Sequence, residues 1–178
     1  MNDYITTYTK KHINPLSPQP EDIDIRDIAH ALSMMVRANG HFPEFYSVGQ
    51  HSIACAREAI ARNYSSRVVL ACLLHDGSEA YLSDITRPVK GELSEYRRIE
   101  KNMQDAIYVR FLGQIPSDEE MSKITDIDNA CLYYEFDHYM GEKLMEQAPL
   151  LVTDPAFETL PFAQVEQEFL DLFATLTV

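Results

Sequence analysis

A histidine and an acid follow directly on a strongly apolar stretch of this chain. Residues 68–74, VVLACLL, are apolar without interruption, and His75 and Asp76 come immediately after them. An imidazole and a carboxylate carried into an apolar interior need a partner, because unpaired buried charge is costly or shifts its pKa until it is neutral. A divalent metal ion suits both groups. The pattern therefore favours a metal site at the end of this stretch.

Further acids follow the histidine at helical spacing. Glu79 comes four residues after His75 and three after Asp76, and Asp84 comes next. On a continuous α-helix, at about 100° per residue, the first three side chains would lie within one quadrant. We expect one helical turn to present two ligands, His75 and Asp76, and a further acid, Glu79, to the same point. Pro88 limits how far such a helix can run.

Two other side chains complete a candidate ligand set. His51 follows Ser47-Val-Gly-Gln50, a capping-box sequence that predicts the start of a helix. Asp128 falls on the apolar stripe of another expected helix, where a lone buried charge again needs a partner. Two imidazoles and two carboxylates suit one divalent ion, namely Mn, Co, Fe, Zn or Mg. We expect one metal ion, because the spacing of the other histidines offers no second site.

The elements that must position these side chains are helices. Apolar periodicity predicts an all-α fold with about six main helices in one domain, 1–178. We expect an N-terminal arm over 1–22, a core over 23–140 and a C-terminal extension over 141–178 with a terminal helix. Within the core we expect five helices. The first covers about 23–38, and the second begins at the capping-box sequence 47–50. The third is the buried helix, capped by Ser65 or Ser66, and the last two cover about 93–112 and 117–140. No segment is a convincing strand.

Composition limits the partners and the compartment. The chain has 178 residues and a formal net charge of −13, which argues against binding a nucleic-acid polymer. The three cysteines indicate buried thiols in a reducing compartment. No apolar run approaches the ~18 residues of a membrane span, and the N-terminal residues lack the apolar region of a signal peptide. We expect a cytoplasmic protein without a membrane partner.

Four segments together resemble a known superfamily: DIAHALSMMVRANGHF, FYSVGQHS, LLHDGSEAYLSDITRPVK and DNACLYYEF. They are similar to the HD-domain metal-dependent phosphohydrolases, and within these to bacterial 5′-deoxyribonucleotidases and phage dATP triphosphohydrolases. The resemblance covers about 23–137. It implies an HD-domain helical bundle with a nucleotide substrate, and it is compatible with a homodimer.

The resemblance implies a role for each candidate side chain. The metal ligands would be His51, His75, Asp76 and Asp128. Glu79 would handle the attacking water or a phosphate-bound proton, and Asp84 would lie near the leaving group and sugar. Arg37 would contact phosphate or base. Each of the two acids also has a purely structural alternative. Glu79 would then only orient a metal ligand, and Asp84 would only cap the segment that follows it.

Other residues bear on the substrate. Arg87 and Lys90 are candidates to neutralise phosphate charge, although such residues are more often surface charges. Ala38 stands where the similar proteins often carry an aromatic, so a base would have to stack elsewhere, on Phe42 or Tyr46. Thr86 stands where a proline is common, which leaves the loop after Asp84 less restrained.

The leading hypothesis is a 5′-deoxyribonucleotidase, which converts a dNMP to deoxynucleoside and phosphate. The acidic balance of the chain favours it mildly over a dNTP triphosphohydrolase, which needs more cations around its site. A second alternative is a non-catalytic nucleotide-binding HD module, and a third is a metal-stabilised scaffold without a substrate.

Overall fold

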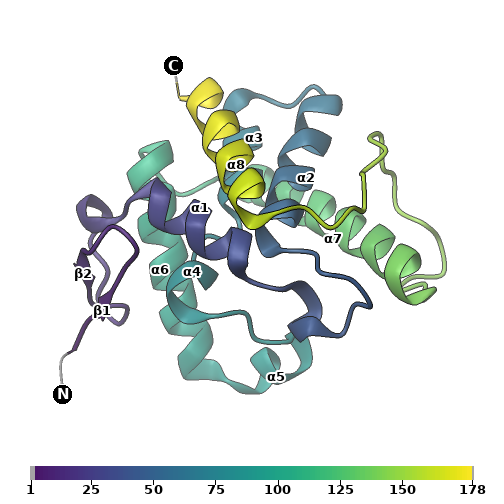
Figure 1. Ribbon diagram of the computed structural model, residues 1–178. Coiled ribbons are helices and arrows are strands. Elements are labelled where there is room, and N and C mark those ends of the chain that lie inside the picture. Colours follow the sequence, from purple (N-terminus) through teal and green to yellow (C-terminus); the bar gives the residue numbers. More distant parts are fainter. Residues whose placement is uncertain (1–2, 178) are drawn as a thin grey trace.

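The computed structural model describes residues 3–177 and consists mainly of helices (Figure 1). Six of them have nine or more residues: α1 (Ile25–Met34), α2 (Val48–Ala61), α3 (Ser66–Leu74), α6 (Ser94–Leu112), α7 (Asp118–Met140) and α8 (Phe162–Leu176). Two are shorter, α4 (Glu79–Leu82) and α5 (Arg87–Glu92), and two are single 3-10 turns, η1 (Pro20–Asp22) and η2 (Arg37–Gly40). The predicted all-α fold is confirmed.

Local capping signals set several helix ends where the sequence predicts them. The side chains of Ser47 and Ser117 form capping boxes with Gln50 and Glu120 at the starts of α2 and α7. Ser65, one of the two serines expected to cap α3, accepts a hydrogen bond from the amide of Val68. These caps satisfy amide groups that the first helical turn leaves without a partner.

Helix α3 forms the centre of the bundle. It packs against α2, α6, α7 and α8, and α8 crosses in front of it in Figure 1. All seven residues of the apolar stretch 68–74 are at most 4% exposed. Burial of a large aliphatic side chain contributes about 1.5–3 kcal/mol. This segment is therefore a fixed core element, and it delivers His75 to a defined place at its end.

The expected helical continuation from His75 to Glu79 is wrong. α3 ends at Leu74, and the next residues turn tightly, with the Gly77 amide bonded to the Leu74 carbonyl at 2.9 Å. A Cβ atom on Gly77 would lie 2.9 Å from the Leu74 carbonyl oxygen and 3.2 Å from Ile107 of α6. The turn fits against α6 because this residue is glycine. Glu79 then begins the separate helix α4.

Helix α1 is also shorter than predicted. It ends at Met34 rather than near Ala38, because Val36 instead forms an antiparallel bridge with Ser47. The Arg37 amide donates to the Tyr46 carbonyl at 2.8 Å. This extended bridge fastens Arg37 beside the start of α2. Ala38, with φ 51°, follows in the left-handed region.

Two segments lie outside the main helices: the N-terminal residues before α1 and the chain between α7 and α8. Two-residue strands β1 (Ile5–Thr6) and β2 (His12–Ile13) form a small antiparallel hairpin, which the expectation of no strand did not include. It is fastened to α1 through the Thr9 amide, which donates to Asp27 at 2.7 Å. The chain between α7 and α8 is irregular, as expected.

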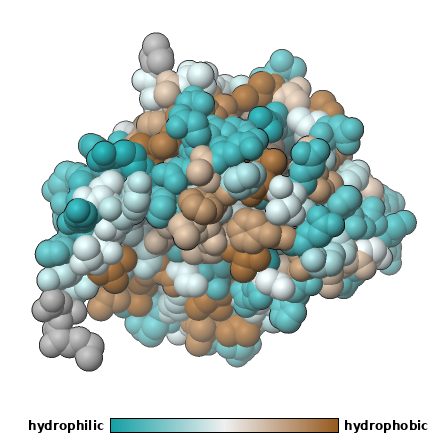
Figure 2. Space-filling model, in the orientation of Figure 1, coloured by the Kyte–Doolittle hydropathy of each residue, from teal (hydrophilic) through white to brown (hydrophobic). Residues whose placement is uncertain are grey.

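The surface shows no single dominant apolar area on the face drawn in Figure 2, where small hydrophobic patches lie between hydrophilic residues. Among the residues that the structure describes, every helix is too short or too polar to cross a lipid bilayer.

Candidate metal centre

The four side chains proposed as metal ligands meet at one point between α2, α3 and α7. The Nε2 atom of His51 lies 3.2 Å from Nε2 of His75 and 3.2 Å from Oδ1 of Asp128. Oδ2 of Asp76 lies 3.4 Å from His75 Nε2 and 3.8 Å from His51 Nε2. Ligands that bind one ion at about 2.0–2.2 Å stand about 3.0–3.6 Å apart. The separations of 3.2–3.4 Å fall in this range, and those of 3.7 Å (His75–Asp128) and 3.8 Å (His51–Asp76) lie just above it. Small movements of the two carboxylates would let the four donor atoms bind one ion.

His51 is completely buried on the first turn of α2, where the Ser47 capping box holds the backbone. Its Nδ1 atom donates to Oε1 of Glu135 at 2.5 Å. This hydrogen bond fixes the ring so that Nε2 faces the other ligands. His75 is oriented in the same way, because its Nδ1 atom donates to the Cys72 carbonyl at 2.7 Å. Both imidazoles are thus presented through Nε2.

Glu135 is a site residue that the sequence interpretation missed. It is 1% exposed, and its Oε2 atom accepts from Arg37 at 3.2 and 3.0 Å. Burial opposes its charge, but Arg37 and then His51 hold the pKa of this carboxyl below its ordinary value. A signal was available, since Glu135 follows Asp128 by seven residues and shares its face of α7.

Arg37, expected to contact phosphate or base, lies behind the ligands. Two of its nitrogens bind Glu135, and its Nη1 atom lies 3.8 Å from Oδ2 of Asp76. The side chain is 11% exposed. In this position Arg37 offsets part of the acidic charge of the cluster, and direct contact with a substrate stays a prediction.

Cys55 is a second residue that the interpretation treated only as a buried thiol. Its Sγ atom lies 3.5 Å from His51 Nε2, and Cys55, His51 and His75 form a group that could hold a metal ion. Burial raises the pKa of the Cys55 thiol well above its ordinary value. A protonated thiol is a poor ligand, whereas the carboxylates of Asp76 and Asp128 are ready donors. We therefore favour the two carboxylates over Cys55.

Glu79 lies at the start of α4, beside the ligands, in an unusual environment. Its side chain is 6% exposed, and within residues 3–177 its Oε2 atom has no hydrogen-bond partner. Burial, and then the charges of Asp76 and Asp84, raise its pKa to about 9. The nearest cation is Lys90, with Nζ 3.9 Å from Oε1. Glu79 therefore holds a proton at neutral pH.

The remaining predicted residues surround this cluster. Asp84 is partly exposed in the turn between α4 and α5. Arg87 is 71% exposed, with Nη2 3.7 Å from Oδ2 of Asp128. Lys90 donates to Glu100 of α6 at 2.6 Å. Phe42, considered for base stacking, instead packs on Tyr139 with ring centroids 4.7 Å apart.

A groove of about 470 Å³ opens beside the ligands. His75, Asp76 and Glu79 line part of it, and α6, the loop that follows α6, the start of α7 and Lys90 of α5 contribute to the rest. The acidic and basic residues of the groove are Asp76, Glu79, Lys90, Arg97, Glu100, Lys101, Asp105 and Asp118. A small substrate in this groove would lie against both the ligands and the buried Glu79.

Comparison with known proteins supplies relatives but no activity. Over 108 residues, 61% of this chain and 58% of the relative, the chain is 34% identical to the uncharacterized protein YfdR of Escherichia coli (strain K12). Over 107 residues, 57% of this chain and 54% of the relative, it is 36% identical to the uncharacterized protein RCAP_rcc00048 of Rhodobacter capsulatus. The chain therefore spans little more than half the length of these curated relatives. It matches no model of a known protein family.

The fold and the site together define a helical protein with a candidate metal centre. Membership of the HD-domain superfamily stays a prediction from the sequence motifs. The function has to be argued from the chemistry of the cluster and the groove.

Proposed function

We propose that this protein is a metal-dependent phosphohydrolase of the HD-domain type that removes the 5′-phosphate from deoxynucleoside monophosphates. One observation carries the proposal: four candidate ligand atoms converge at 3.2–3.8 Å, next to a buried acid, and two of them, from His75 and Asp76, belong to residues that line an open groove. A divalent ion in this set would polarise a phosphoryl oxygen and lower the pKa of a bound water. The other steps rest on the residues of the chain.

Glu79 is the candidate for proton transfer. Because burial and the adjacent acids raise its pKa to about 9, the ionised form is a stronger base than an ordinary carboxylate. A bound divalent ion would offset the charge of Asp76 and lower the pKa of Glu79, so that Glu79 would be ionised in the loaded site. Glu79 would then accept the proton of the attacking water as the new phosphorus–oxygen bond forms. It returns the proton to the sugar oxygen as the old bond breaks, which leaves deoxynucleoside and phosphate.

Arg37 and Glu135 are assigned positioning roles. Glu135 holds the His51 ring through Nδ1, and Arg37 neutralises Glu135 while its Nη1 atom faces Asp76. Without Arg37, His51 and Asp76 would adjoin an uncompensated buried carboxylate. The pair therefore keeps two ligands in place.

The charge balance of the groove favours a monophosphate over a triphosphate. Besides Glu79, four acids line it against three cations, and two of these cations are already paired, Lys90 with Glu100 and Lys101 with Asp105. A triphosphate carries several negative charges and would be repelled by this lining. Arg97 and the exposed Arg87 are enough for one phosphate group.

The direct test is phosphate release with Mn, Co or Mg from a panel of dNMPs, dNTPs and the matching ribonucleotides, with products separated by chromatography. Phosphate and deoxynucleoside from dNMPs would support the proposal. Release of inorganic triphosphate from a dNTP would establish the alternative triphosphohydrolase. Nucleotide binding without turnover would establish the non-catalytic module.

Variants separate metal binding from proton transfer. His75→Ala and Asp76→Ala should lose both the metal and the activity, whereas the exposed His41→Ala should lose neither. Glu79→Ala should retain the metal and lose about 10²-fold or more in turnover, as for a missing general base. Full metal content in His75→Ala would contradict the assigned ligand set. Wild-type turnover by Glu79→Ala would remove Glu79 from the mechanism.

A further inference from the structure

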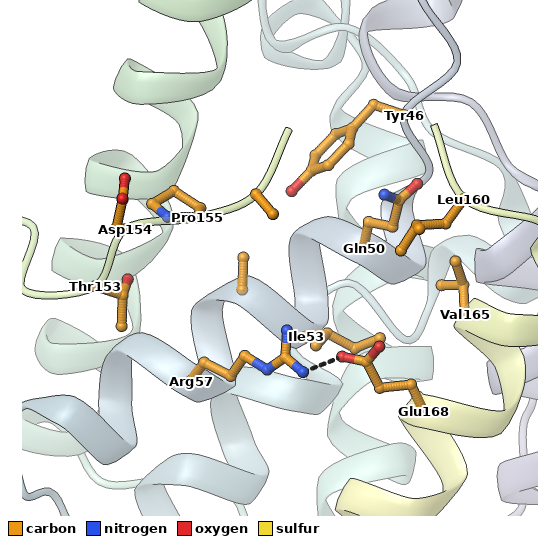
Figure 3. A pocket seen from close by; sticks show the side chains of 12 residues that line it. Tyr46, Gln50, Ile53, Arg57, Thr153, Asp154, Pro155, Leu160, Val165 and Glu168 are labelled. Atoms are coloured by element: carbon orange, nitrogen blue, oxygen red, sulfur yellow. Dashed lines mark ion pairs between the residues drawn. The ribbon is translucent and has the colours of Figure 1, made fainter. Parts of the chain in front are cut away.

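A second cavity lies on another face of α2, away from the metal centre. It has a volume of about 360 Å³, is partly open to solvent, and is lined by α2, the start of α8 and the irregular segment 153–160 (Figure 3). On α2 its lining residues include Gln50, Ile53, Ala54 and Arg57. At about 100° per residue these side chains point roughly a third of a turn away from His51. The cavity is therefore separate from the ligand cluster.

The irregular segment over the cavity is fastened at both ends. The buried carboxylate of Glu58 accepts from the amides of Val152 at 3.0 Å and Thr153 at 2.9 Å. At the other end, Gln50 Nε2 donates to the Glu158 carbonyl at 2.8 Å. Residues 154–157 span the space between these two attachments. Because Gln50 and Glu58 both belong to α2, these hydrogen bonds attach the segment to α2 at two points, and the cavity lies between the attachments.

Most of the cavity wall is apolar, but one buried polar group faces the interior. Tyr46 is 2% exposed, and Figure 3 shows its hydroxyl directed toward the space between α2 and the segment. Within the described residues this hydroxyl makes no hydrogen bond, and it is not one of the side-chain atoms cut off from solvent, so water in the cavity can reach it. A ligand that offers a donor or an acceptor would take the place of that water.

The charges at the rim select against an anion. Arg57 is paired with Glu168 at 2.5 Å, as the dashed line in Figure 3 marks. Asp154 adds a second acid to the lining, so the cavity carries one excess negative charge. An anionic ligand would have to displace Glu168 from Arg57 and would face Asp154. A neutral ligand avoids both costs.

We propose that this cavity binds an uncharged, mainly apolar molecule about the size of one or two rings, which offers one hydrogen-bonding group to the Tyr46 hydroxyl. Its volume lies at the lower end of the range of about 300–1,000 Å³ for small-molecule sites. The site does not depend on the metal centre or on the proposed hydrolase activity.

Benzamide and benzoate test the class of ligand, because they have the same shape and differ in charge. We would measure their binding to the full chain, without added metal, by ligand-observed NMR up to roughly 5 mM, the range of weak fragments. We expect benzamide to bind and benzoate to bind at least about tenfold more weakly. No benzamide binding, or tighter binding of benzoate, would overturn the proposal.

Two variants locate the site. Ala54→Leu should abolish benzamide binding because it fills the cavity, while Ala174→Leu makes the same change at an exposed position of α8 and should bind as the wild type does. Tyr46→Phe should weaken binding about threefold to tenfold, as for one lost hydrogen bond. Its stability should be unchanged, since that hydroxyl is unpaired. Wild-type binding by folded Ala54→Leu would refute the location.

Discussion

The environment of Glu79 predicts a pH-dependent gain in stability when its charge is removed. In the folded protein its pKa is about 9, against an ordinary value of 4.5. The folded state therefore binds one more proton than the unfolded state between these pH values. Stability contributed by this group falls as the pH rises through the window. Glu79→Gln, which resembles the protonated form, removes that loss.

The size of the expected gain in stability follows from the difference between the folded and the ordinary pKa of Glu79. Each pH unit above 4.5 costs about 1.4 kcal/mol until the folded pKa is reached, so the penalty at pH 7 is about 3 kcal/mol. The metal-free Glu79→Gln variant should match the wild type near pH 4. At pH 7 it should be more stable by about 3 kcal/mol, which corresponds to a Tm higher by about 6–12 °C for a chain of this size.

The assay is urea or thermal unfolding of both proteins from pH 4 to pH 8 with a chelator present. The chelator matters because a bound cation would offset the charge of Asp76, one cause of the raised pKa. Glu92→Gln, at an exposed position of α5, makes the same change and should alter stability by less than about 0.5 kcal/mol at every pH. A stability difference for Glu79→Gln that does not vary with pH would refute the reasoning.

Three other substitutions test the structural supports of the site by urea unfolding. Glu135→Gln removes the closer of the two acids that face buried Arg37 and should destabilise the protein by about 3–5 kcal/mol, whereas exposed Glu142→Gln should not. Ser47→Ala removes the cap of α2 and should cost about 1–2 kcal/mol; an unchanged stability would show that the capping box does not hold His51 in place. Ala38→Gly relieves a left-handed residue and should stabilise by about 0.5 kcal/mol or more, while Ala61→Gly at the end of α2 should destabilise. A loss of stability in Ala38→Gly would contradict the strained backbone at that position.

Local signals account for the part of the fold that the sequence predicts. Serine caps at Ser47, Ser65 and Ser117 and the apolar run before His75 each act within a few residues. Such signals specify where helices begin and which face is buried. Buried charge on apolar faces pointed to His75, Asp76 and Asp128, and His51 was added because it coincides with that set at the start of a predicted helix. The structure brings the four side chains together.

Contacts between distant segments decided the rest. The short α1 depends on the bridge from Val36 to Ser47, and the turn after Leu74 depends on the fit of Gly77 against α6. The Glu135–Arg37 pair joins residues 98 positions apart. The raised pKa of Glu79 arises only when burial brings it near other acids. Residue types and periodicity therefore determined the helices and the candidate ligands of this protein. Tertiary packing alone determined which charges are paired, whether Glu79 keeps its proton and where cavities remain. These properties depend on distances between segments that are far apart in the chain, and local sequence does not encode those distances.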